Sequence, residues 1–161
     1  MSVAILDVLD PRAVCLGVEA SNSEAVITLL AGKLVEIGKV RSSYAGAVVA
    51  REQSMPTGLP LGEINVAVPH TDPEHVIAPA IALATLKTPV LFGSMDDPDE
   101  RIPVRIVMAL ALTDKTAQIG MLQTVAGLIQ APATLQALLA AETVPAALDA
   151  LRTTAECDLH G

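Results

Sequence analysis

The residue most suited to chemistry is a histidine that directly follows a proline at the end of an apolar stretch. Residues 62–68 are predicted to form a short strand that stops at Pro69, because proline has no N–H to donate to a sheet ladder. His70 would then stand at the carboxyl edge of the sheet, where ligands gather in open α/β folds. An unperturbed imidazole has a pKa of about 6.5 and offers a neutral, nucleophilic nitrogen at physiological pH. His70 is therefore either a reacting group or a hydrogen-bonded residue of a turn.

Two nearby residues raise the alternative of a metal site. Asp72 and His75 supply a carboxylate and a second imidazole, which are ligands of zinc. A spacing of five residues places the two histidines on no common face, and prolines flank the group, so we predict no bound metal. We also predict no cofactor. Gly58 and Gly62 lack the spacing and the following lysine of a nucleotide-binding phosphate loop.

Composition narrows the functional classes. The chain has 161 residues, of which 52% are hydrophobic, and its formal net charge is -8. The negative charge and the scarcity of aromatic residues, which are limited to Tyr44 and Phe92, argue against binding to nucleic acids or anionic membranes. No apolar run is long enough to span a bilayer, and the first residues lack the basic region of a signal peptide. We therefore expect a cytoplasmic protein with no direct membrane insertion.

Hydrophobic periodicity predicts alternating helices and strands. Helical spacing covers about 23–37, 43–53, 116–129, 133–141 and 143–151, while apolar or alternating runs predict strands at about 14–18, 62–68, 80–86, 90–92 and 104–112. Residues 87–89 are predicted to be a turn and the chain from about 153 a loose tail. This pattern indicates one domain over 1–161. Its fold is α/β, a three-layer α/β/α sandwich with a mixed, mostly parallel central sheet of about five strands.

Three motifs in the middle of the chain resemble those of a known family. They are Arg51-Glu52, Pro56-Thr57-Gly58-Leu59 and Val66-Ala67-Val68-Pro69-His70. Together they resemble the signature of the fructose/mannitol-type (type 2) IIA domains of the bacterial sugar phosphotransferase system, and the likeness covers roughly residues 20–152. Many members carry a second histidine where this chain has Gln118. A glutamine there, and the loop after His70, are similar to the galactitol-specific subgroup.

The resemblance implies a phosphotransferase component that acts through a phosphohistidine. His70 would accept a phosphoryl group from phospho-HPr and pass it to a IIB component, which works with a IIC membrane permease in the uptake of a sugar or polyol such as galactitol. Arg51 would stabilise the phosphate, since its guanidinium matches phosphate oxygens. Gln118 would make a polar contact with the phosphate or the histidine ring. Thr57 or Thr71 could add a hydroxyl contact to the same groups, or be a turn residue.

A second hypothesis keeps the fold but changes the role. Related IIA-like domains bind target proteins in a phosphorylation-dependent way and are not tied to transport. Neighbouring genes for a IIB component and a IIC permease would favour transport, and their absence would favour regulation. An apolar rim for a partner protein is expected to include Leu59, Leu61 and Ile77.

Overall fold

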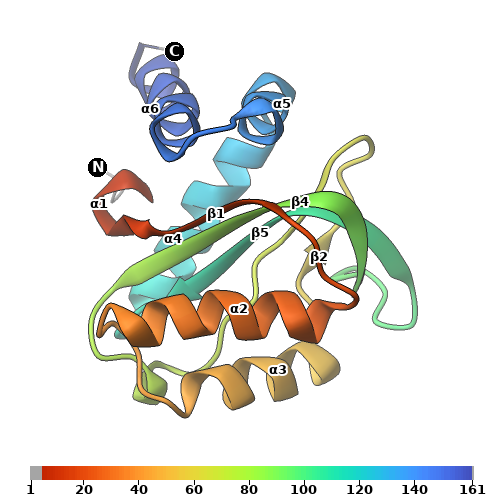
Figure 1. Ribbon diagram of the computed structural model, residues 1–161, viewed down its shortest axis with the longest axis vertical. Helices are drawn as coiled ribbons and strands as arrows, with labels where there is room; N and C mark the ends of the chain where they lie inside the picture. Colours follow the sequence, from red (N-terminus) through yellow and green to blue (C-terminus); the bar gives the residue numbers. More distant parts are fainter. Residues whose placement is uncertain (1–4, 161) are drawn as a thin grey trace.

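A five-stranded sheet with helices on both faces forms the structure, a computed structural model in which residues 5–160 are described (Figure 1). The strands are β1 (Leu9–Val18), β2 (Gly58–Leu59), β3 (Asn65–Ala67), β4 (Ala80–Gly93) and β5 (Arg101–Ala111). The helices are α1 (Ile5–Val8), α2 (Ser23–Glu36), α3 (Tyr44–Ser54), the 3-10 turn η1 (Pro73–His75), α4 (Lys115–Ile129), α5 (Pro132–Ala140) and α6 (Val144–His160).

The sheet is mixed and has the strand order β1-β4-β5-β3-β2. The pairs β1–β4 and β3–β5 are parallel, whereas β4–β5 and β2–β3 are antiparallel. Two of the four strand pairs are therefore parallel. The short connection between β4 and β5 makes these two strands antiparallel neighbours. Since β3 and β5 run in the same direction, their carboxyl ends meet at one edge of the sheet.

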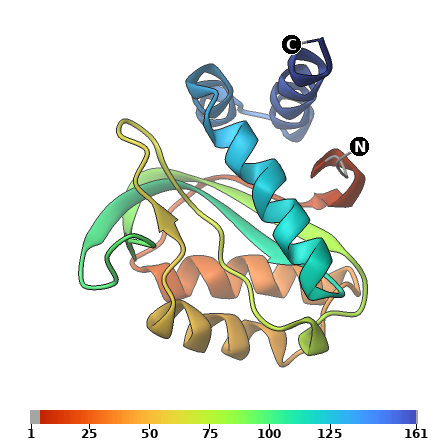
Figure 2. The same ribbon diagram turned by 180° about the vertical axis from the view of Figure 1, so that it is seen from behind.

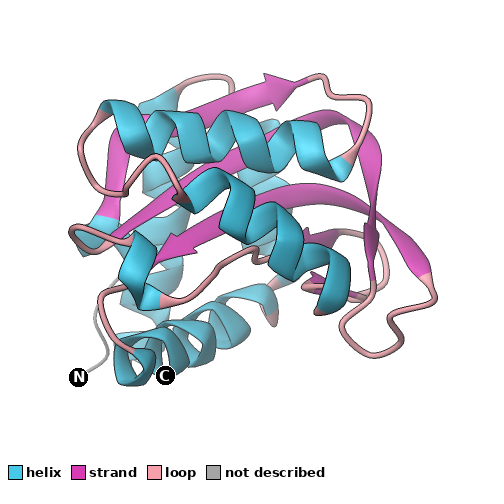
Figure 3. Ribbon diagram, turned by 90° about the horizontal axis from the view of Figure 1, so that it is seen from below, coloured by secondary structure: helices cyan, strands magenta, loops and turns pink. Residues whose placement is uncertain are grey.

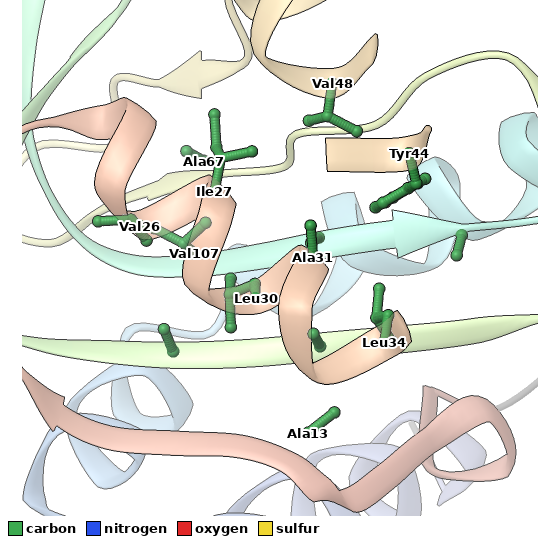
Figure 4. Packing of buried hydrophobic residues seen from close by; sticks show 14 of the residues in the cluster. Ala13, Val26, Ile27, Leu30, Ala31, Leu34, Tyr44, Val48, Ala67 and Val107 are labelled. Carbon is green, nitrogen blue, oxygen red and sulfur yellow. The ribbon is translucent and has the colours of Figure 1, made fainter. Parts of the chain in front are cut away.

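Helices cover both faces of this sheet, which confirms the predicted three-layer α/β sandwich. α2 and α3 lie on one face (Figure 3), and α4 crosses the other face with α5 and α6 beyond it (Figure 2). Each face has its own aliphatic core, one under α2 and α3 and the other under α4, α5 and α6. Figure 4 shows part of the first core, to which α2 contributes Leu30 and Leu34 and α3 contributes Tyr44 and Val48.

The second helix illustrates why the sequence folds this way. Its buried residues recur at helical spacing and are Val26, Ile27, Leu30, Ala31 and Leu34. Asn22 caps it, because its side chain accepts a hydrogen bond of 2.8 Å from the Ala25 N–H. Ser21 or Ser23 is the expected cap from the sequence, and the structure places the cap between them. Gly38 follows with a φ of 75°, a conformation that favours glycine.

Four elements differ from the prediction, since α1 and β2 are not predicted from the sequence and β4 and α6 have other bounds. β4 is one continuous strand, so the turn predicted at residues 87–89 is wrong. The exposed 87–89 segment stays on the strand because a register shift between Thr85 and Val90 absorbs the irregularity. In addition, α6 continues to His160, beyond the point near 153 where a loose tail is expected, and Gly161 lies outside the described residues. Within 5–160, no helix combines the length and the hydropathy needed to cross a membrane.

Candidate functional site

His70 follows β3 by three residues and is half-buried at the carboxyl edge of the sheet. Its Nδ1 lies 2.8 Å from the carbonyl oxygen of Val68. A carbonyl oxygen can only accept, so Nδ1 carries the proton and donates it to this bond. The lone pair of the neutral ring is therefore on Nε2, the nitrogen that is not engaged by the backbone.

The surroundings of His70 favour the neutral imidazole. Burial lowers its pKa below the ordinary value, because the charged ring loses hydration, and the positive charge of Arg51 acts in the same direction. The hydrogen bond to Val68 and the negative charge of Asp72 oppose this shift without reversing it. The balance of these effects favours the uncharged ring of His70 at physiological pH.

Three hydrogen bonds hold the backbone on either side of this histidine. The Val68 N–H donates to Thr57 Oγ1 at 3.2 Å, and the Pro69 carbonyl accepts from the Leu110 N–H at 2.9 Å. On the far side, Gln118 Nε2 donates to the Thr71 carbonyl at 2.7 Å. These bonds come from the β2 side, from β5 and from α4, so the segment is fixed from three elements and not by its own turn alone.

Arg51 and Gln118, the two companions predicted for His70, both lie against the histidine loop. Arg51 is in the last turn of α3, and its Nη1 lies 3.2 Å from Asp72 Oδ1. Gln118 is in the first turn of α4, which begins soon after β5 ends and therefore lies beside the end of β3. The amide of Gln118 is used by the Thr71 backbone, and the guanidinium of Arg51 pairs with Asp72, so neither is hydrogen-bonded to the ring of His70.

A buried acid beside this loop, Glu52, has no role in the predictions made from the sequence. Glu52, next to Arg51 on α3, accepts two hydrogen bonds from Thr57: one from its N–H at 2.8 Å and one from its hydroxyl at 2.7 Å. Burial raises the pKa of Glu52, although both hydrogen bonds favour its charged form. Thr57 therefore connects Glu52 to Val68, and its hydroxyl does not reach the ring as one sequence hypothesis expects.

Tyr44 is a second residue that sequence reasoning missed. It is fully buried at the start of α3, and its hydroxyl donates to the Leu110 carbonyl at 2.7 Å. The N–H of the same Leu110 holds Pro69. Tyr44 is the one tyrosine in a chain with almost no aromatic residues, and this rarity is the sequence feature that could have drawn attention to it. Its link to the histidine loop through Leu110 is visible only in the fold.

The metal-site alternative finds no support in the geometry of His75. Its Nδ1 lies 2.8 Å from Ser43 Oγ, and its Nε2 lies 3.8 Å from Glu74 Oε1. The ring therefore faces the start of α3 and its own neighbour. Among the residues that the structure describes, no three His, Cys, Asp or Glu side chains are arranged to hold a metal ion.

Exposed apolar side chains occur in the segments that flank the site. Ile77 and Leu61 from the predicted rim are exposed, whereas Leu59 is partly buried. Met55, just after α3, and Ile119, next to Gln118, are 60% and 58% exposed. Large exposed aliphatic groups that gather at one place are typical of a surface that meets another protein.

Comparisons with known proteins agree with this geometry. The family described as "Phosphoenolpyruvate-dependent sugar phosphotransferase system, EIIA 2" matches residues 7–153. The chain is 28% identical over 123 residues to the PTS system galactitol-specific EIIA component of Escherichia coli K12, covering 76% of this chain and 81% of that protein. It is also 31% identical over 128 residues to the transcriptional regulator ManR of Bacillus subtilis, covering 80% of this chain but 18% of ManR.

Solved structures show the same fold. The mannitol-specific cryptic phosphotransferase enzyme IIA CmtB of Escherichia coli superposes with a TM-score of 0.76 at 20% identity, over 92% of this chain and 98% of that one. A IIA protein of Streptococcus mutans described as PtxA gives 0.75 at 24% identity, over 89% of both chains. The chain therefore belongs to the EIIA type 2 family of the phosphoenolpyruvate-dependent sugar phosphotransferase system, a family of phosphotransfer components.

Proposed function

We propose that this chain accepts a phosphoryl group on His70 from phospho-HPr and passes it to a IIB component during the uptake of a sugar or polyol. The observation that carries this proposal is the hydrogen bond from His70 Nδ1 to the Val68 carbonyl. It leaves the lone pair of Nε2 free on a ring that burial keeps neutral. Both conditions are needed for a histidine to act as a nucleophile at phosphorus.

In the proposed step, the Nε2 lone pair attacks the phosphorus atom as the bond between phosphorus and the donor atom breaks. The donor keeps that electron pair, and the phosphoryl group moves without a gain or loss of protons at Nδ1. The ring gains positive character as the new N–P bond forms. The Val68 carbonyl, already an acceptor for Nδ1–H, stabilises that charge. Transfer to the IIB component is the same step with His70 as the leaving group.

Arg51 is the proposed partner of the phosphoryl oxygens. Phosphoryl transfer proceeds through a loose transition state, and the protein contributes mainly positioning and charge stabilisation. The guanidinium of Arg51 is held beside the loop by Asp72 and is still about a third exposed. It could turn from the carboxylate to an arriving phosphate, which carries more negative charge. Gln118 would contribute by fixing the loop through Thr71.

The remaining parts of the proposal concern partners and substrate. A galactitol-like polyol is favoured by the likeness to the galactitol-specific EIIA component. The exposed side chains of Met55, Ile77 and Ile119 are proposed to meet phospho-HPr and the IIB component in turn. The IIC permease would be an indirect partner, and this role would place the chain in the cytoplasm.

Intact-mass analysis tests the proposal directly. The chain is incubated with enzyme I, HPr and phosphoenolpyruvate, and we expect a gain of one acid-labile phosphoryl group. His70→Ala should lose this gain, whereas His75→Ala, which removes the neighbouring histidine that faces Ser43, should keep it. A chain that gains no phosphoryl group, or a His70→Ala variant that gains one as the native protein does, would refute the proposed function.

The likeness to ManR favours regulation as the second candidate. Here the phosphorylated or unphosphorylated chain would bind a target protein without feeding sugar uptake. Deleting the gene separates the two roles. Loss of phosphoenolpyruvate-dependent polyol uptake would support transport, whereas intact uptake with altered gene expression would support regulation.

A further inference from the structure

The β2–β3 ladder stops one residue pair before the histidine loop. Gly58 pairs with Ala67 and Leu59 with Val66, so Thr57 and Val68 would form the next pair in this register. At that position a side-chain acceptor replaces the backbone acceptor of the ladder, because the Val68 N–H donates to Thr57 Oγ1. Gly58, the residue after Thr57, lies against β4, because a Cβ there would be 2.5 Å from the Gly93 carbonyl oxygen.

The orientation of the Thr57 hydroxyl is set by Glu52. A carboxylate only accepts hydrogen bonds, so the bond of 2.7 Å between Thr57 Oγ1 and Glu52 Oε1 uses the hydroxyl proton. The lone pairs of Oγ1 are then available to the Val68 N–H. Glu52 Oε2 accepts from the Thr57 N–H as well, so both atoms of Thr57 that can donate are held by one buried carboxylate.

The series of hydrogen bonds from Glu52 through Thr57 and Val68 leads to the ring of His70. Val68 is fixed at its N–H by Thr57, and the next residue, Pro69, is fixed at its carbonyl by Leu110. The Val68 carbonyl lies between these two anchors and accepts from His70 Nδ1. Its direction therefore follows from the bonds on either side, and it decides which nitrogen of His70 carries the proton.

We propose that Glu52 and Thr57 are positioning residues that hold His70 in the tautomer with a free Nε2. Burying a carboxylate costs free energy of folding, because the charge loses its hydration, and hydrogen bonds to the buried oxygens offset this cost. Here both side-chain hydrogen bonds of Glu52 come from Thr57. The orientation that they give to the Thr57 hydroxyl in turn fixes the N–H of Val68. The catalytic significance of this tautomer rests on the proposed function, but its control by Thr57 does not.

Thr57→Val is the decisive variant, because valine keeps the shape and removes the hydroxyl. The matched control is Thr85→Val. Thr85 is equally buried, and its Oγ1 accepts from the Gly17 N–H at 3.0 Å, in the β1–β4 region at the other side of the sheet. Thr57→Ser retains the hydroxyl and should restore the native behaviour.

The first measurement is the nitrogen-15 spectrum of the His70 ring in the unphosphorylated protein. The native chain and Thr85→Val should show a protonated Nδ1 and an unprotonated Nε2, whereas Thr57→Val should show a mixture of tautomers. The second measurement is the phosphorylation rate by HPr. We expect Thr57→Val to lower kcat about tenfold to a hundredfold with little change in KM, since a misplaced reacting group costs rate of this order.

Each outcome decides one of the two proposals. Native ring signals and native rates in Thr57→Val would overturn the positioning role. A mixture of tautomers in a chain that no phosphoryl donor modifies would support the positioning role and refute the proposed function. If Thr57→Val does not fold, Glu52→Gln replaces it. A carboxamide keeps only one of the two acceptors, so a smaller change in the same direction is expected, and unchanged signals would overturn the inference.

Discussion

In the proposed function, Asp72 would compete with the phosphoryl group on His70 for Arg51, which makes Asp72→Asn an informative perturbation. The ion pair joins Arg51 Nη1 and Asp72 Oδ1 at 3.2 Å, with side chains that are 35% and 52% exposed. Pairs at this exposure contribute about 0.2–1 kcal/mol. Releasing Arg51 to the phosphate should therefore raise the equilibrium constant for phosphorylation of His70 by about 1.4- to 5-fold, because 1.36 kcal/mol corresponds to a factor of ten.

A second effect acts in the same direction. Asparagine removes one negative charge beside a group that would carry close to two of them, and it removes the charge that raises the pKa of His70. The phosphorylated form therefore gains stability relative to the unphosphorylated chain, whose ring is already neutral at physiological pH. Because the carboxylate is half exposed, the total effect should shrink as salt rises from low to physiological ionic strength.

The assay measures the ratio of phosphorylated to unphosphorylated chain at equilibrium with a limiting amount of phospho-HPr, by intact mass after a rapid quench. Asp10→Asn is the matched control. It removes the same charge from another ion pair, in which Asp10 Oδ2 lies 2.8 Å from Arg12 Nη2, on the edge strand furthest from β2. Equal ratios for the two variants, or a lower ratio for Asp72→Asn, would refute the view that Arg51 leaves Asp72 for the phosphate.

Three further results are expected. Tyr44→Phe leaves the buried Leu110 carbonyl without its side-chain donor, and it should lower the free energy of unfolding in urea by about 1–3 kcal/mol. Gln118→Leu removes the donor to Thr71 and should slow phosphorylation several-fold without abolishing it, whereas complete loss would mean that the amide contacts the phosphate itself. The phosphorylation rate should decline as the ring takes up a proton, at a pH below the ordinary histidine pKa of about 6.5, because burial lowers the pKa of His70. The unfolded chain binds this proton first, so acidification through that range also destabilises the fold, and His70→Gln should remove that part of the loss.

Much of this architecture can be predicted from local patterns. Helical spacing identifies α2 because the residues from Val26 to Leu34 bury one face, and the Pro69-His70 pair marks the end of β3. The continuity of β4 cannot be predicted in this way. Lys87, Thr88 and Pro89 have the composition of a turn, and only pairing with β5 on both sides of a register shift keeps them on the strand.

The residues of the site also differ in whether they can be predicted from the sequence. His70 and Arg51 can be proposed from motifs, since their chemistry is carried by residue type and position in the chain. The partners of Glu52 cannot. Its burial depends on the turn of the chain after α3, which places Thr57 against the carboxylate, and the use of that carboxylate is visible only when Thr57 and Val68 are brought together. The pairing of Arg51 with Asp72 depends in the same way on where the loop after β3 turns.

The hydrogen bond from Tyr44 to Leu110 has an optical consequence. The chain contains no tryptophan and one tyrosine, so its intrinsic fluorescence comes from that single phenol. Burial raises the pKa of Tyr44 well above the usual range, so phenolate absorbance should appear in an alkaline titration only as the fold opens. Leu110 also holds Pro69, one residue before His70. The protein thus contains an unlabelled fluorophore two hydrogen bonds away from its histidine loop, and we expect its emission to change when the loop moves.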